Sequence, residues 1–310
     1  MEFAHDAADG HGHHHHSPGT FGRAFAAGIV LNSAIIALEV VGGLAAHSMA
    51  LISDAAHNAS DVLGLAMAWG AAVLARRPPT ARRTYGLRRA SILAALGNAM
   101  LLLVATGGVG WEAIRRLGAP SVVRADVMIG VSLIAAVVNA VSALLFAGGR
   151  KLDLNLQAAF AHLAGDAAIA LGVVGAGVLV RATGWMQIDS IVSLAVSAMV
   201  LVATYSVLKQ SLDLALDAVP AGIDPNGVRA FLSSLPGVVE VHDLHIWGMS
   251  TTEAVLTAHL VMRDGAPAGG GFLCEIEQTL HDRFRIEHST LQIEPQDAPV
   301  PCRLQPAERI

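Results

Sequence analysis

The sequence of 310 residues is 54% hydrophobic and only 15% charged, with a mean hydropathy of +0.54, which excludes an ordinary soluble chain and indicates a polytopic membrane protein with room for a small soluble domain. The formal net charge of -5 comes without a basic cluster outside the loops, which argues against nucleic acid as a partner. Cys274 and Cys302 have no spacing typical of a disulfide framework or a cysteine zinc site.

The first twenty residues are polar and rich in histidine. They lack the charged cap and apolar core of a cleavable signal peptide, so we interpret 1–20 as a disordered leader. Neutral imidazole is a common metal ligand, and the leader is therefore either a weak metal-collecting tail or a plain flexible segment. We divide the rest into a transmembrane domain at 21–212, a cytoplasmic metal-binding and dimerisation domain at 213–297 and a tail at 298–310.

Six apolar stretches of roughly membrane-spanning length predict six transmembrane helices. They lie at 21–45, 49–75, 90–112, 122–147, 156–180 and 188–209. Most Lys and Arg residues lie on the leader's side, chiefly in the loop between the second and third stretches and at Arg150 and Lys151. By the positive-inside rule we expect a multi-pass protein of the cell inner membrane with both termini in the cytoplasm.

After Pro220 the pattern changes to short amphipathic helices and strands. DPNGVRAFLSSLPG predicts a capped helix, VVEVHDLHIWGM and EAVLTAHLVM two strands, FLCEIEQTLHDRFR a second helix and HSTLQIE a third strand. This order is typical of a sheet with helices on one face, and so of an α+β domain.

The second apolar stretch, LISDAAHNASDVLGLA, carries Asp54, His57 and Asp61. Ionisable side chains are costly inside a membrane and usually mark an ion or substrate path. On a helix, His57 and Asp61 share a face, because residues four apart differ by about 40° in direction. Asp54 belongs to the same stripe.

The fifth stretch repeats this H-x-x-x-D spacing with His162 and Asp166. One such pair is explained equally well by a structural histidine, but two pairs on otherwise apolar helices are harder to explain by packing. If the two helices touch, two imidazole nitrogens and two carboxylate oxygens form a tetrahedral set suited to zinc, and also to cobalt or cadmium. Because protonated imidazole cannot bind metal, such a site permits exchange of zinc for protons.

These motifs resemble those of the cation diffusion facilitator family, in its zinc, cobalt and cadmium exporting branch. The resemblance rests on LISDAAHNASDVLGL, AAFAHLAGDAAIALGVV, VHDLHIWGMSTTEAVLTAHLVM and EHSTLQIEP, within a match from Phe21 to Pro295. It implies a homodimeric exporter with six transmembrane helices per protomer and a C-terminal cytoplasmic α+β domain of ferredoxin-like, metallochaperone-like fold. Cytoplasmic zinc would be exchanged for outside protons by alternating access, with zinc as transported and regulatory ion and no prosthetic group.

The resemblance also implies roles for particular residues. His57, Asp61, His162 and Asp166 become the transport site, with Asp54 in a supporting or relay role beside it. In the cytoplasmic domain the metal-binding positions are His242, His259 and Glu294, with His245 and His288 as nearby candidates, although ordinary interface histidines explain them almost as well.

Two features of this domain qualify the expected metal site. Strand periodicity predicts that His242 and His245 face opposite sides and do not share an ion. Gln292 stands where some relatives have a histidine ligand, so binding at Glu294 is expected to be weaker or differently completed.

Three other functions remain as alternatives. The first is an exporter whose main cargo is cobalt, cadmium or another divalent cation instead of zinc. The second is a membrane-anchored metal sensor, and the third is an intramembrane metallohydrolase. An anchor needs no charged pairs at bilayer depth, and a hydrolase needs a general-base arrangement such as H-E-x-x-H, which is missing. We therefore expect a transporter that is not an enzyme.

Overall fold

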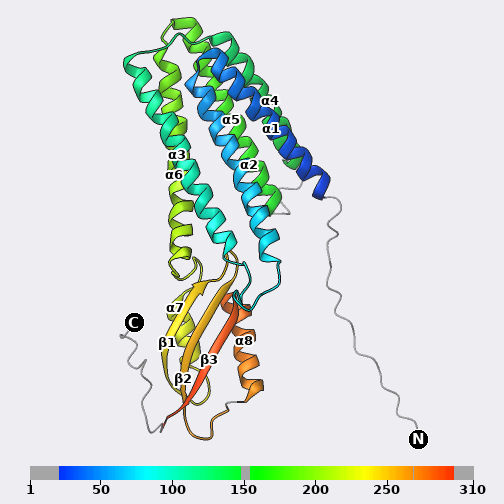
Figure 1. The fold of residues 1–310 in the computed structure, drawn as a ribbon, viewed down its shortest axis with the longest axis vertical. Coiled ribbons are helices and arrows are strands. Elements are labelled where there is room, and N and C mark those ends of the chain that lie inside the picture. The colour runs from blue at the N-terminus through cyan, green and yellow to red at the C-terminus, as the bar shows by residue number, and fades with distance from the viewer. Residues whose placement is uncertain (1–20, 148–153, 268, 297–310) are drawn as a thin grey trace, which may run out of the picture.

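The computed structural model describes residues 21–147, 154–267 and 269–296, and shows a long bundle of helices standing on a small α+β domain (Figure 1). The bundle helices are α1 (Phe21–Ala46), α2 (Met49–Ala75), α3 (Ala90–Gly118), α4 (Ala125–Ala147), α5 (Leu154–Thr183) and α6 (Gln187–Ala215). Five of them are long and apolar enough to cross a membrane, and α1 contributes a shorter apolar stretch, Val30–Ala46. The predicted six-helix architecture is confirmed, while the leader, the tail, Arg150 and Lys151 lie outside the described residues.

Three helices, α3, α5 and α6, extend several residues beyond their predicted spans. With 29 residues each, α3 and α6 are about 44 Å long, against about 30 Å for a hydrocarbon core. The added end of α3 is polar and internally paired, because Glu112 accepts hydrogen bonds from Arg115 at 3.3 Å and Arg116 at 3.1 Å. Because these helix ends are not apolar, a hydropathy pattern does not show that the helix continues through them.

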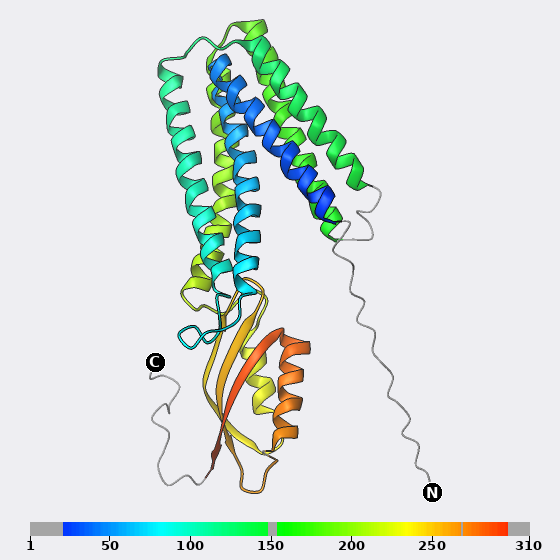
Figure 2. The ribbon, with the colours of Figure 1, turned by 45° about the vertical axis from the view of Figure 1, so that its right-hand side comes forward.

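The helices meet at the end away from the α+β domain, called the distal end here, and diverge toward that domain. Figure 2 shows α1, α4 and α5 separating from α2, α3 and α6 at the near, or proximal, end. At the distal end a group of buried side chains, the distal apolar cluster, fills the bundle. It consists of Ala46, Ala50, Leu51, Val123, Met128, Val131, Val173, Ala176 and Val180. The bundle is therefore sealed distally and open proximally.

The α+β domain has the predicted helix, strand, strand, helix, strand order. Its elements are α7 (Pro225–Ser233), β1 (Val238–Gly248), β2 (Ala254–Met262), α8 (Gly270–Phe284) and β3 (Ile286–Pro295). β1 and β2 form an antiparallel hairpin, and β3 pairs parallel to β2 after the crossover through α8. This is the ferredoxin-like order without its first strand. Leu232 of α7 and Leu280 of α8 are fully buried with Leu256 of β2 in the core.

A β-bulge interrupts β1 between His242 and His245, where Asp243 adopts a left-handed conformation with φ of 49°. The register pairs His242 with His259 and His245 with Thr257. Since His259 and Thr257 are two residues apart on β2, they share a face, and so do their partners. The prediction that His242 and His245 face opposite sides is wrong, because the extra residue of the bulge reverses the alternation.

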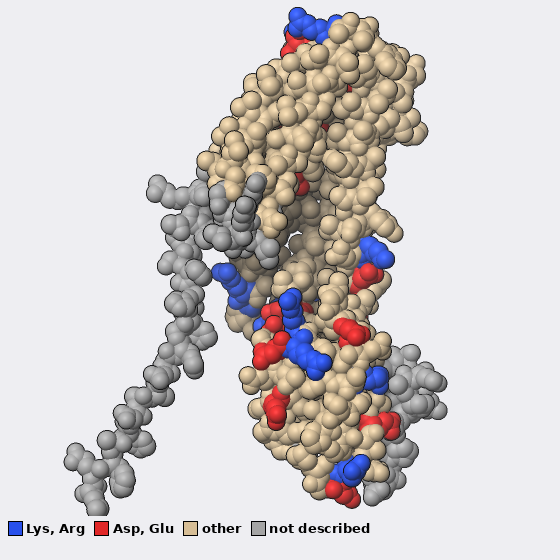
Figure 3. Space-filling view, turned by 180° about the vertical axis from the view of Figure 1, so that it is seen from behind, with Lys and Arg blue, Asp and Glu red and all other residues tan. Residues whose placement is uncertain are grey.

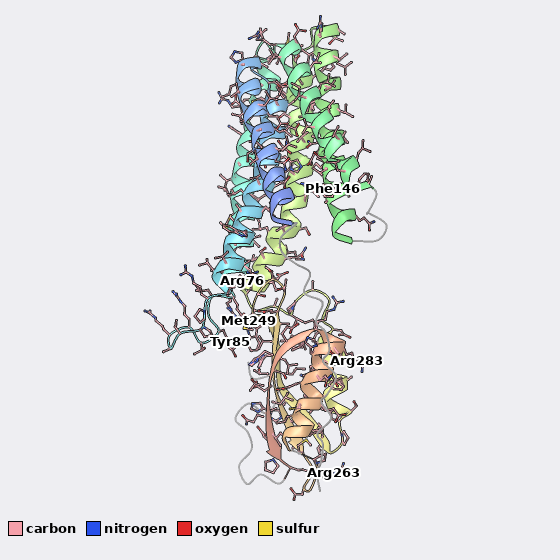
Figure 4. All side chains as sticks on the ribbon, turned by 90° about the vertical axis from the view of Figure 1, so that its right-hand side faces the viewer. Arg76, Tyr85, Phe146, Met249, Arg263 and Arg283 are labelled. Carbon is pink, nitrogen blue, oxygen red and sulfur yellow. The ribbon has the colours of Figure 1, made fainter. Side chains whose placement is uncertain are left out.

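The loop between α2 and α3 joins the bundle to the α+β domain. Arg88 pairs with Glu253 at 2.8 Å and Arg89 with Asp217 at 2.5 Å. Tyr85, labelled at this junction in Figure 4, places its ring edge against His288, with 5.9 Å between the ring centroids. The proximal end of α3 is thus tied to the domain by ion pairs.

Candidate metal centres

The structure brings the two predicted His/Asp pairs of α2 and α5 together. His57 Nε2 lies 3.5 Å from Asp166 Oδ1, and His57 Nδ1 lies 3.9 Å from Asp61 Oδ2. His162 Nε2 lies 3.6 Å from Asp61 Oδ2 and 3.6 Å from Asp166 Oδ2. Each histidine therefore lies near both carboxylates. His57, Asp61 and Asp166 each offer one ligand atom, and these three atoms lie within 4.8 Å of one another; His162 lies beside this group.

These separations have the scale of a metal site. In a tetrahedron of nitrogen and oxygen ligands about 2.0–2.2 Å from zinc, neighbouring ligand atoms lie about 3.3–3.6 Å apart. Three of the four distances, 3.5, 3.6 and 3.6 Å, lie in that range, and the fourth, 3.9 Å, lies above it. His57 faces Asp61 through Nδ1 and Asp166 through Nε2, so its ring must shift before one of its nitrogens and both carboxylates hold the same ion. Two carboxylates and two neutral imidazoles also neutralise a divalent cation, as burial in a membrane requires.

The site is open toward the α+β domain. The exposed fraction is 46% for the His162 side chain and 32% for Asp61, against 19% for His57 and 7% for Asp166. His162 and Asp61 each lie one helical turn nearer the proximal end than their partners, so exposure rises in that direction. Figure 3 shows the hollow between the helices from behind, with acidic side chains inside the bundle.

A separate cavity lies farther along α2, and none of the four site residues lines it. It has a volume of about 860 Å³ and is lined by Gly64, Ala68 and Ala72 of α2, by residues of α3 and by the β1–β2 turn. Ala68 follows Asp61 by two helical turns and lies on the same face of α2. The more exposed side chains of the site, His162 and Asp61, therefore lie on its proximal side, whereas the distal apolar cluster lies on its other side.

Asp54 and Glu39 form a second polar layer beside these four side chains. Asp54 is 1% exposed, and neither of its carboxylate oxygens has a hydrogen-bond partner among the described residues. Glu39 of α1 is completely buried and accepts a hydrogen bond from Asn58 Nδ2 at 3.0 Å. Asn58 directly follows His57 in the sequence, so this hydrogen bond ties α1 to the part of α2 that carries the site.

The α+β domain holds a second cluster, at the pairing of β1, β2 and β3. His259 Nδ1 lies 2.8 Å from Glu294 Oε1, and His242 Nε2 lies 3.6 Å from Glu294 Oε2. His242 is 1% exposed, and neither ring nitrogen has a hydrogen-bond partner within the described ranges. Two imidazoles and a carboxylate converging in this way are a donor set suited to zinc or a similar ion.

Asp243 extends this cluster, and the sequence prediction did not include it. Its Oδ2 lies 3.5 Å from His259 Nε2, and its Oδ1 lies 2.9 Å from His245 Nε2. Gln292 lies opposite His259 in the β2–β3 register, and its side-chain amide donates a hydrogen bond to Glu294 Oε1 at 2.9 Å. The bulge places Asp243 beside both His245 and His259, on the ring nitrogen of His259 opposite to the one that faces Glu294.

His288 lies apart from this cluster. It pairs with Val255 in the β2–β3 register, while His259 pairs with Gln292 four residues farther along β3. Four residues of strand correspond to about 13 Å. His288 instead contacts Tyr85 of the α2–α3 loop.

Comparisons with known proteins cover nearly the whole chain. Residues 25–214 match the family described as "Cation efflux transmembrane domain", and residues 220–296 match "Cation efflux protein, cytoplasmic domain". The chain is 35% identical over 285 residues to the metal cation efflux system protein CzcD of Cupriavidus metallidurans, covering 92% of this chain and 90% of that protein. It is 35% identical over 267 residues to the zinc transporter ZitB of Escherichia coli, covering 86% and 83%.

A third relative and one solved structure complete the comparison. The cadmium, cobalt and zinc/H(+)-K(+) antiporter of Bacillus subtilis is 30% identical over 285 residues, covering 91% of each chain. The metal-bound C-terminal domain of the CzcD transporter matches 23% of this chain and 99% of its own, with 36% identity and a TM-score of 0.21.

Proposed function

The chain belongs to the cation efflux family, and from this premise we propose that it exports zinc from the cytoplasm in exchange for protons. Proteins of this family are transporters and not enzymes, and the activity class is divalent metal cation efflux across a membrane. The identity of the ion, the exchange with protons and the residues that carry both are the proposal.

The observation that carries this proposal is the convergence of His57, Asp61, His162 and Asp166 at separations of 3.5 to 3.9 Å. These four side chains are the transport site. Asp54, buried without a hydrogen-bond partner among the described residues, supports the site electrostatically. Because the site opens toward the α+β domain, the structure represents the inward-facing state, in which a cytoplasmic ion enters.

Proton exchange follows from the donor set. Neutral imidazole binds zinc and protonated imidazole does not, so a proton arriving from the acidic outside displaces the ion from His57 or His162. Zinc arriving from the cytoplasm displaces the proton in turn. The ion leaves after the distal end opens and the proximal end closes, which is alternating access with one shared site.

Zinc is favoured over the other cations by the balance of nitrogen and oxygen donors. Manganese or magnesium is better served by oxygen ligands alone. Cobalt and cadmium share much of the preference of zinc, and the Bacillus subtilis relative is named for all three ions. A main cargo of cobalt or cadmium is therefore the second candidate.

The α+β domain is assigned to the cytoplasm, together with both termini of a protein in the inner membrane. The Arg-rich loop from Arg76 to Arg89 lies on its side of the bundle, as the positive-inside rule requires. Its match to a family described as "ZT_dimer" supports a homodimer. His242, His259 and Glu294, whose ligand atoms lie within 4.8 Å of one another, bind a regulatory zinc ion there.

Zinc flux into proteoliposomes, driven by an imposed pH gradient, tests this function. We expect zinc uptake when the lumen is acidic and the α+β domain faces outward, with competition by cobalt and cadmium but little by magnesium. Asp61→Ala is expected to abolish uptake while the protein still inserts. Gradient-independent uptake, or full uptake by Asp61→Ala, contradicts the proposal.

A further inference from the structure

The cavity beside α2 runs from the apolar part of the bundle to the Arg-rich loop. Its apolar wall includes Gly64, Ala68 and Ala72 of α2 and Ala94 and Ala95 of α3. The three residues of α2 are spaced by four positions and so lie on one face of the helix. Because these side chains are small, they do not fill the space between α2 and α3. This apolar part of the cavity is called the α2–α3 groove here.

The groove has the length of a lipid chain within one leaflet. From Gly64 to Ala75, α2 advances by about 16 Å, close to half of a hydrocarbon core of about 30 Å. Gly64 and Asn98 are the most distal residues of α2 and α3 in the lining. A Cβ atom at Gly64 would lie 2.8 Å from Asn98 Nδ2, so the two helices approach closely there. The groove therefore ends distally at this contact and extends toward the α+β domain.

The proximal end of the cavity is basic. Arg76, labelled at the foot of the bundle in Figure 4, follows the last residue of α2 and lines the cavity with Arg77 and Arg88. Arg88 pairs at 2.8 Å with Glu253, the one acidic residue of the described lining. Neither Arg76 nor Arg77 forms an ion pair among the described residues. Two uncompensated guanidinium groups thus lie where the apolar helix ends, which is the level of lipid headgroups.

We propose that this cavity binds one anionic phospholipid, such as phosphatidylglycerol, with its phosphate at Arg76 and Arg77 and one acyl chain in the α2–α3 groove. Guanidinium groups bind phosphate oxygens through paired hydrogen bonds, and basic pockets between transmembrane helices suit anionic headgroups. With the α+β domain in the cytoplasm, as proposed above, the lipid belongs to the cytoplasmic leaflet.

The shape of the cavity favours a lipid over a free phosphate ion. A phosphate ion uses only the basic end and leaves the apolar groove unfilled, whereas a phospholipid matches both parts. The lining also includes the β1–β2 turn from Ser250 to Glu253. The bound lipid therefore contacts the bundle, the Arg-rich loop and the α+β domain at once.

Protection of a thiol in the groove tests this proposal. In the full-length protein with Cys274→Ser and Cys302→Ser, Ala72→Cys places a thiol in the groove. Val73→Cys places one on an exposed part of α2 outside the lining. In micelles of an uncharged detergent, maleimide labelling at Ala72→Cys should slow as phosphatidylglycerol is added, and much less with an equal amount of phosphatidylcholine. Labelling at Val73→Cys should not distinguish the two lipids.

Charge variants measure the part played by the two arginines. Combining Arg76→Gln with Arg77→Gln should raise the phosphatidylglycerol needed for half-protection about thirtyfold, since each arginine near a membrane surface contributes about fivefold. The matched control combines Arg115→Gln with Arg181→Gln, which removes two exposed distal arginines and should leave protection at the parent value. Replacing Arg76 and Arg77 by lysine keeps the charge, and protection should stay close to that of the parent.

Four results would overturn the proposal. Equal protection by phosphatidylglycerol and phosphatidylcholine would mean that the groove takes any lipid. Protection by inorganic phosphate alone would identify a free anion as the occupant. Protection that rises with protein concentration and ignores lipid would mean that a second copy of the chain covers the cavity. An equal loss in the glutamine and lysine variants would indicate packing instead of charge.

The labelling requires no zinc, and no transport-site residue lines the cavity. The lipid site and the exporter proposal are therefore tested separately. Headgroup-selective protection in a protein that carries no zinc would leave the lipid site standing and refute only the exporter.

Discussion

Replacing Asp166 by asparagine tests the transport site most quantitatively. Asp166 is the least exposed of the four side chains, at 7%, and its two oxygens face His57 at 3.5 Å and His162 at 3.6 Å. Asparagine keeps the size of the side chain and one ligand oxygen but removes the negative charge. The substitution therefore leaves the packing of α5 intact and changes the electrostatics of the site alone.

The expected loss follows from the distance between charge and ion. Two unit charges 4 Å apart attract by about 4 kcal/mol at an effective dielectric constant near 20. A divalent ion doubles this attraction to about 8 kcal/mol. We assume that the amide oxygen, together with water entering from the open proximal side, restores half of this binding free energy. The remaining 4 kcal/mol or so weakens zinc binding about a thousandfold.

The assay is the zinc concentration that gives half-maximal uptake in proteoliposomes under a fixed pH gradient. Asp126→Asn is the control, since it removes an equally negative but exposed side chain that pairs with Arg181, and it should leave uptake unchanged. Asp166→Asn should require about a thousandfold more zinc, or show no uptake in the accessible range. Uptake with the parent's zinc dependence in Asp166→Asn would refute the ligand assignment.

Three further results are expected. His57→Asp supplies an oxygen in place of a nitrogen ligand and should raise manganese and cadmium uptake relative to zinc, so an unchanged ion ranking would count against the site. Glu294→Gln, which removes the carboxylate that lies 2.8 Å from His259, should shift the zinc dependence of transport without abolishing it; complete loss would mean that the α+β domain does more than regulate. The hydrogen bond to Asp282, followed by the charge of Glu287, raises the pKa of His281 above its ordinary value of 6.5. Protonated His281 thus stabilises the folded α+β domain below about pH 6.5, and this contribution is lost as the pH rises through the raised pKa. An NMR titration of His281 should give a lower midpoint in Asp282→Asn than in the parent protein. An equal midpoint in both proteins would contradict the pairing.

Local patterns were sufficient for most of the fold. Apolar length alone identifies the helices, because a membrane span requires about 20 apolar residues. The four-residue spacing of His57 and Asp61, repeated at His162 and Asp166, places each pair on one helix face. That α2 and α5 lie side by side was only a hypothesis from the sequence, and the structure brings their side chains within 3.9 Å.

The remaining features depend on backbone irregularity or on contacts between distant segments. The alternation of side chains along β1 was predicted for a regular strand, and the β-bulge at Asp243, where the backbone is left-handed, breaks it. The prediction therefore placed His245 on the wrong face relative to His242. It also gave no reason to consider Asp243. The hydrogen bonds of Asp189 to Ser48 and Met49 cannot be predicted from local patterns, because the packing of α6 against α2 sets them. The hydrogen bond from Asn58 to Glu39 likewise requires α1 to lie against α2.

X-ray absorption of bound zinc tests the central claim most directly, that four side chains of two helices hold one ion. The protein should carry His242→Ala and His259→Ala, so that the second cluster does not contribute. We predict one zinc ion per chain with two imidazole nitrogens and two carboxylate oxygens at about 2.0–2.2 Å, and its loss in Asp61→Ala. A zinc shell without imidazole, or zinc retained unchanged in Asp61→Ala, would contradict the account.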